Sequence, residues 1–130
     1  MNTIMQTDHQ ELNTHLGVIN RQGPYMGSNA QESLDLVMAM SNFGQQVSVF
    51  FLDDGVFQLL NNQSASAIER KQFTKGFAAL EFYDVENIYV CATSLEERGL
   101  SASDLIIGAI VVGKDELSDL LQAHKQVINF

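Results

Sequence analysis

The residue with the clearest chemical potential is Cys91, the single cysteine in a chain of 130 residues. It ends the run Ile88–Cys91 and lies two residues before Thr93, which with Glu96 has the spacing of a helix capping box. Amide groups and the helix dipole there favour a thiolate, the form that attacks sulfur or accepts it as a persulfide. The charges of Glu96 and Glu97 oppose this effect, and free cysteine is among the most buried residue types. Two interpretations stay open, a reactive thiol and a buried structural cysteine.

A second group with chemical potential is Asp53-Asp54-Gly55, which follows a strongly apolar segment. Clustered carboxylate oxygens suit hard cations. However, spacing fixes no third acidic ligand nearby, and these residue types also serve turns and caps at the end of a strand. We favour the turn. The three histidines lack metal-ligand spacing with one another: His9, His15 and His124. We therefore expect no metal and no cofactor.

Residues 23–28 form a third candidate, a loop with Gly23 and Gly27 before an expected helix. Free backbone amides at the start of a helix can hold an anion. The loop does not match the dinucleotide-binding fingerprint, and a connecting loop is the favoured interpretation. A flavodoxin-like nucleotide or flavin binder would need a recognisable phosphate loop at this place. That hypothesis ranks last.

Charge and cysteine content restrict the class of protein. The formal net charge of −9 repels a phosphate backbone, so direct binding to nucleic acid is not expected. One cysteine excludes an internal disulfide and a cysteine-rich zinc site, and it fits a reducing compartment. The longest apolar run, residues 105–112, is far shorter than the roughly 20 residues of a membrane helix.

The amino-terminal segment, residues 1–14, is polar and has no helical or strand periodicity. It contains Asp8 and Glu11 but no Lys or Arg, and it lacks the apolar region of an export signal. We predict a tail at 1–14, a single domain at 15–130 and a cytoplasmic location.

The candidate residues must be positioned by alternating strands and helices. Short apolar runs predict strands at 16–19, 47–52, 88–91, 105–112 and 127–130. Helical spacing and capping patterns predict helices at 29–43, 66–80, 93–98 and 117–124, with Gly44 and Gly99 as stops. This alternation predicts a three-layer α/β domain with about five mainly parallel strands.

Reacting groups in such a sheet are expected outside the carboxyl ends of the strands. Three segments should therefore meet there: 23–28, 53–55 and 91–94, the last of which adds Ser94.

Aromatic and aliphatic side chains are crowded around the end of the second expected strand. Phe50 and Phe51 lie within the strand and are predicted to be core residues, while Val56 and Phe57 lie beyond it. The latter two could complete the core or leave an apolar patch for a protein partner. We keep both as candidate partner-binding residues.

Two long stretches resemble a known family. Residues 49–60 read Val-Phe-Phe-Leu-Asp-Asp-Gly-Val-Phe-Gln-Leu-Leu, and residues 89–100 read Tyr-Val-Cys-Ala-Thr-Ser-Leu-Glu-Glu-Arg-Gly-Leu. Both resemble the TusC/DsrF group of the DsrE/F-like family, as do Glu32-x-Leu-Asp35 and the terminal Ile128-Asn-Phe130. The resemblance covers about residues 15–130 and implies a DsrE/F-like fold.

The resemblance also implies a role and partners. TusC-type proteins belong to a complex with TusB-like and TusD-like subunits, expected as a dimer of heterotrimers. That complex passes a persulfide from TusA to a TusE-like acceptor and on to the enzyme that makes 2-thiouridine in tRNA. The corresponding DsrEFH complex acts in dissimilatory sulfur oxidation, and the family alone does not choose between the two settings.

The resemblance assigns the reactive cysteine to the D-type subunit, so a non-catalytic accessory role is the first hypothesis. Cys91 nevertheless occupies the position that resembles the reactive cysteine of D-type relatives. The alternative is therefore a sulfur carrier with Cys91 as its persulfide-bearing thiol. An isolated chain could also form a homo-oligomer through surfaces meant for its partners.

Overall fold

The structure is a computed structural model that describes residues 15–23, 29–60, 87–105 and 109–130. Its centre is a sheet of five parallel strands in the order β4-β3-β2-β1-β5. The strands are β1 (Leu16–Asn20), β2 (Val47–Phe51), β3 (Asn87–Cys91), β4 (Ile110–Val112) and β5 (Gln126–Asn129). The predicted α/β class and parallel sheet are confirmed. The expected helix at 66–80 and the tail at 1–14 lie outside the described residues.

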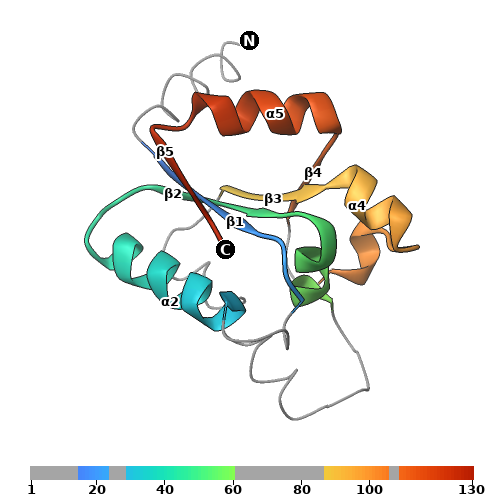
Figure 1. Cartoon of the computed structure of the whole chain (residues 1–130), viewed down its shortest axis with the longest axis horizontal. Coiled ribbons are helices and arrows are strands. Elements are labelled where there is room, and N and C mark those ends of the chain that lie inside the picture. Colours follow the sequence, from blue (N-terminus) through green and yellow to red (C-terminus); the bar gives the residue numbers. More distant parts are fainter. Residues whose placement is uncertain (1–14, 24–28, 61–86, 106–108) are drawn as a thin grey trace.

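Helices lie on both faces of this sheet (Figure 1). The α-helices are α2 (Asn29–Asn42), α4 (Ala92–Glu97) and α5 (Lys114–Ala123), and the 3₁₀-helices are η1 (Asp53–Leu59) and η3 (Ala102–Asp104). Figure 1 places α2 and α5 on opposite faces. Gly44 and Gly99 follow α2 and α4 with φ angles of 85° and 67°, so both predicted helix stops are confirmed. No described helix is long and apolar enough to cross a membrane.

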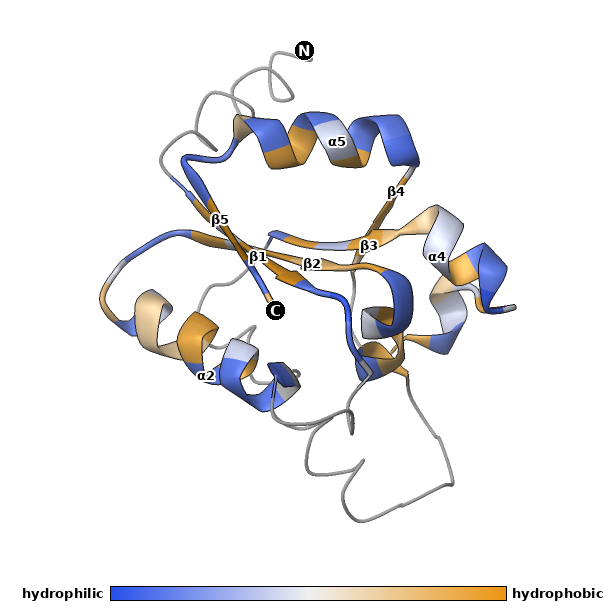
Figure 2. Cartoon of the chain, in the orientation of Figure 1, coloured by the Kyte–Doolittle hydropathy of each residue, from blue (hydrophilic) through white to orange (hydrophobic). Residues whose placement is uncertain are grey.

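The strands β1 and β2 are buried apolar runs in the interior of the sheet. Every residue of β1 and β2 is buried, as expected of central strands that are covered on both faces. On the α2 face the core includes Val18, Val49 and Phe51, and on the α5 face it includes Ile19 and Phe50. Figure 2 shows the corresponding pattern in α5, whose hydrophobic side faces the sheet.

Besides the helix expected at 117–124, which begins at Lys114, three predicted boundaries were wrong. The strand expected at 105–112 is a strand only at Ile110–Val112; Leu105 forms an isolated antiparallel bridge with Leu60, and 106–108 lie outside the described residues. The preceding helix η3 begins with a capping box between Ser101 and Asp104, and Leu105 is its C-cap residue.

The other two errors concern the ends of β2 and β3. Asp53–Gly55 was predicted as a simple turn, but the turn continues as η1 to Leu59. Thr93 was predicted as the N-cap of α4, whereas Cys91 takes that position without a side-chain capping bond. The strand β3 therefore passes into α4 with no connecting residue.

Candidate functional site at the carboxyl edge of the sheet

A hydrogen bond joins the segments that follow the carboxyl ends of β2 and β3. The backbone N–H of Asp53, just after β2, donates to Oγ of Ser94 in α4 at 2.8 Å. Because β2 and β3 are neighbours, this bond joins the two segments that follow them. The structure thus confirms the prediction that residues 53–55 and 91–94 lie together at this edge of the sheet. Of the loop 23–28, only Gly23 is described.

Two arginines that the sequence reading did not predict as site residues hold the carboxylates of this edge. Nη1 of Arg21 lies 3.3 Å from Oδ2 of Asp53, and Nε of Arg98 lies 3.0 Å from Oδ1 of Asp54. Arg98 also donates from Nη1 to the carbonyl of Ser94 at 3.2 Å. Each aspartate is thus paired with a cation, and no group of three metal-ligating side chains occurs among the described residues. Of the two arginines, Arg98 could have been found from the sequence, because it lies within the family-like motif at residues 89–100.

The backbone of this edge is tightly constrained. Asp53 has a φ of 50°, in the left-handed region that non-glycine residues rarely adopt. Leu52 donates its N–H to the carbonyl of Asn20 at 2.9 Å, and Gly55 donates to the carbonyl of Leu52 at 2.8 Å. A Cβ at Gly55 would lie only 2.0 Å from the carbonyl oxygen of Asn20. The chain therefore turns directly against the end of β1, and glycine is required for that close approach.

Cys91 lies in the core of this edge. Its residue is 7% exposed, and its side chain belongs to the apolar cluster of the α5 face, together with Val112, Leu117 and Leu120. The helix that Cys91 caps has only six residues. Two leucines of α5 thus belong to the same apolar cluster as the buried Cys91.

The two candidate partner-binding residues differ in exposure. Val56 is fully buried in the core of the α2 face, so it offers no surface to a partner in this structure. Phe57 packs against the same cluster but is half-buried. Only Phe57 keeps surface that a partner could contact. Phe50 and Phe51 are fully buried, as predicted.

The Ser94→Ala variant tests the bond that joins the two strand ends. It leaves the N–H of Asp53 without its acceptor, and we expect the free energy of unfolding to fall by about 1 to 2 kcal/mol. Urea unfolding measures the change. Ser118→Ala is the matched control because Ser118 is exposed on α5, and it should alter stability by less than about 0.5 kcal/mol. Equal stability of wild type and the Ser94 variant would show that water replaces the hydroxyl.

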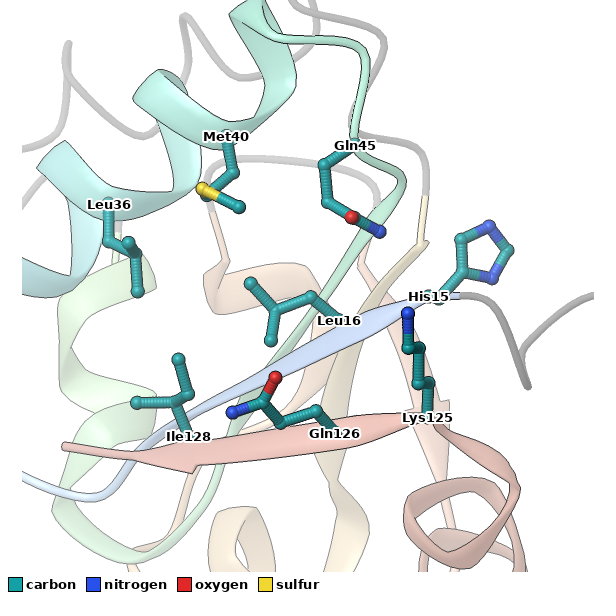
Figure 3. A pocket seen from close by; sticks show the side chains of 8 residues that line it. All are labelled: His15, Leu16, Leu36, Met40, Gln45, Lys125, Gln126 and Ile128. Atoms are coloured by element: carbon teal, nitrogen blue, oxygen red, sulfur yellow. The ribbon is translucent and has the colours of Figure 1, made fainter.

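A pocket of about 140 Å³ lies elsewhere, between α2 and the edge strand β5 (Figure 3). Leu36 and Met40 of α2 and Ile128 of β5 give it apolar walls, and Lys125 lies at its polar side. Leu16 and Gln126, the first residues of β1 and β5, also line it. The pocket is thus at the amino ends of these strands, away from Cys91 and Asp53.

The fold and this edge define an open parallel α/β protein with a single cysteine at the end of β3. The family model described as "DsrE/DsrF-like family" matches residues 14–130. The crystal structure of the YchN protein from E. coli aligns with a TM-score of 0.72 at 22% sequence identity, covering 90% of this chain and 99% of that one. The chain belongs to the DsrE/DsrF-like family.

Within that family, the curated proteins that the chain resembles include TusC homologs. It is 40% identical to Protein TusC homolog of Pseudomonas aeruginosa over 111 residues, which cover 85% of this chain and 93% of the relative. It is 35% identical to the Vibrio vulnificus protein of the same name over 117 residues, covering 90% and 99%. The Aliivibrio fischeri homolog is 32% identical over 115 residues, covering 88% and 98%. The resemblance inferred from the two motifs is confirmed.

Proposed function

We propose that this chain is a TusC-type subunit of a cytoplasmic sulfur relay that serves tRNA 2-thiouridine synthesis, and that it acts by assembly and not as a sulfur carrier. Its likeness to TusC homologs over most of both chains supports the relay. The observation that carries the non-catalytic role is the burial of Cys91. A thiol that is 7% exposed and enclosed by apolar side chains is not available to a persulfide donor.

The proposed partners are TusB-like and TusD-like subunits in a dimer of heterotrimers, which deliver sulfur to a TusE-like acceptor. Two apolar areas could serve such contacts. One is Phe57, half-buried beside the carboxyl edge, and the other is the edge strand β4, where Ile110 and Val111 are 47% and 40% exposed. When its partners are absent, the same areas could pair two copies of this chain.

The alternative is a sulfur carrier in which Cys91 bears the persulfide. Its favourable feature is the place of Cys91 at the N-cap of α4, where backbone amides can stabilise a thiolate. This role requires α5 to move away from the thiol. The DsrF role in dissimilatory sulfur oxidation is a further alternative that shares the assembly function but differs in the pathway served.

The decisive experiment is the Cys91→Ser variant in the assembled complex. The chain is expressed with its TusB-like and TusD-like partners, and transfer of labelled sulfur to the TusE-like acceptor is measured beside size-exclusion chromatography. We expect normal assembly and a transfer rate within about twofold of wild type, because serine is close to isosteric with the buried thiol.

The matched control is the corresponding cysteine-to-serine change in the TusD-like subunit, which should abolish transfer. If the Cys91 variant assembles but does not transfer sulfur, Cys91 is a carrier and the proposed role is wrong. If neither variant affects transfer, the complex does not act through these thiols and the relay proposal itself fails.

A further inference from the structure

His124 lies where α5 ends and the chain turns toward β5. It is 8% exposed and is the C-cap residue of α5. Its ring meets Phe50 of β2 edge-on, with the ring centroids 5.4 Å apart. It also lies over Gly17 of β1, where an added Cβ would be 3.4 Å from two atoms of the ring. His124 thus attaches the end of α5 to the two central strands.

The burial of His124 and its unpaired Nε2 favour a neutral ring with the proton on Nδ1. Nδ1 lies 2.6 Å from the carbonyl oxygen of Leu120 and must donate to it, since a carbonyl has no proton to give. This places the proton of the neutral ring on Nδ1. The other nitrogen, Nε2, is buried and has no hydrogen-bond partner among the residues that the structure describes. A proton on Nε2 would add a buried charge and an unsatisfied donor.

The helix that His124 attaches contributes side chains to the apolar cluster that contains Cys91. Leu117 and Leu120 of α5 form one apolar cluster with Cys91, and Phe50, which contacts the His124 ring, belongs to the same cluster. Figure 1 shows α5 lying across this face of the sheet. A change that weakens the contact at His124 therefore acts on the cluster in which the thiol is buried.

We propose that neutral His124 is a latch that holds α5 on the sheet, and that its protonation in mild acid releases α5 locally and exposes Cys91. The latch does not require that Cys91 carries sulfur. It is therefore independent of the proposed function.

The surroundings of His124 determine the direction in which its pKa is shifted. Burial lowers the pKa of His124 from its ordinary value of 6.5; the hydrogen bond to Leu120 opposes this, and the nearby His15 adds to it. The ring of His15, the residue before β1, lies 6.3 Å away between centroids. Tyr89 of β3 stacks on Phe50, and Lys125 is the next residue in the chain.

The carboxylates of α5 are exposed on its solvent side: Asp115, Glu116 and Asp119. The nearest titratable side chains described around His124 are thus basic or neutral, and none of them stabilises a charged ring. Because the latched state binds a proton more weakly than the open state, acid favours the open state. The stability contributed by the latch is complete above the ordinary pKa and is lost as the pH falls below it.

The single cysteine makes the latch measurable. Native protein is treated with a dipyridyl disulfide, which reacts with thiols in acid as well as at neutral pH, and the rate is divided by that of the urea-unfolded chain at the same pH. This ratio corrects for ionisation of the thiol. We expect the protection of Cys91 to fall by at least about threefold between about pH 8 and about pH 5, while far-UV circular dichroism stays unchanged.

Two matched variants identify the group responsible. His124→Asn keeps an amide N–H that can donate to Leu120 but cannot be protonated, so its protection should not depend on pH. His15→Asn should keep the pH dependence. Protection that stays constant in wild type, that changes equally in the His124 variant, or that is lost only when the whole chain unfolds would overturn the latch.

Hydrogen exchange in the wild-type chain provides a test that needs no variant. After correction for the intrinsic rate, amides of Leu117, Leu120 and Leu121 should exchange faster in mild acid, whereas amides of β1 and β2 should keep their protection. Equal changes in α5 and in the central strands would contradict local release.

Discussion

The Phe50→Ala variant is expected to lose about 3 to 5 kcal/mol of unfolding free energy. Phe50 is fully buried in β2, its ring stacks on Tyr89 with centroids 5.1 Å apart, and its edge meets His124. Removing the ring leaves a cavity between the sheet and α5 and takes away both aromatic contacts. Urea unfolding followed by circular dichroism measures the loss.

Phe43→Ala is the matched control, because it deletes the same side chain at a site that is 88% exposed. Its stability should stay within about 0.5 kcal/mol of wild type. Similar losses in the two variants would contradict the packing described here. A loss at Phe50 below about 1 kcal/mol would mean that α5 collapses into the vacated space.

Gly55→Ala should be the second severe change, with a loss of about 3 kcal/mol. The new Cβ would lie 2.0 Å from the carbonyl oxygen of Asn20, and a backbone oxygen cannot rotate away as a flexible side chain can. Either β1 or η1 must shift, and the N–H of Leu52 would then lose its bond to the same carbonyl. Thermal and urea unfolding both report this loss.

Gly113→Ala provides the comparison for that change. Gly113 has a φ of −75°, and an added Cβ there would contact nothing within 4 Å. This variant should unfold within about 0.5 kcal/mol of wild type. If Gly55→Ala is equally harmless, the approach of η1 to β1 is looser in solution than the structure indicates.

The sheet could be predicted because each central strand is a short and nearly continuous apolar segment between turn residues. Val47–Phe51 and Ile88–Cys91 read as strands covered on both faces, and both are buried. The stops at Gly44 and Gly99 were equally clear, since both residues adopt positive φ. These features depend on local sequence alone.

The details of the site could not be predicted in the same way because they depend on long-range contacts. Ser94 was expected at the edge of the sheet, but nothing local indicates that its hydroxyl accepts from Asp53, 41 residues away. Arg21 pairs with Asp53 across 32 residues. The sequence left a reactive thiol and a buried structural cysteine open at Cys91 and favoured the second from position alone. The burial of Cys91 depends on side chains from several elements that are distant in the sequence.

The burial of Cys91 also changes how its resemblance to the D-type position should be understood. The same place at the end of β3 can hold a reactive thiol or a core residue, depending on what covers it. Here the cysteine is buried in the apolar cluster that also contains Leu117 and Leu120. The burial of the cysteine is therefore the feature to compare between subunits.

The strand order has a consequence for biosynthesis. β1 lies between β2 and β5, and its pairing partner for Leu16 on one side is Gln126, 110 residues later in the chain. During translation β1 can join β2 early, but its other edge has no neighbour until residues 126–129 have left the ribosome. A nascent chain therefore presents an open edge of apolar strand for most of its synthesis, which is a site for chaperone binding or for pairing between ribosome-bound chains.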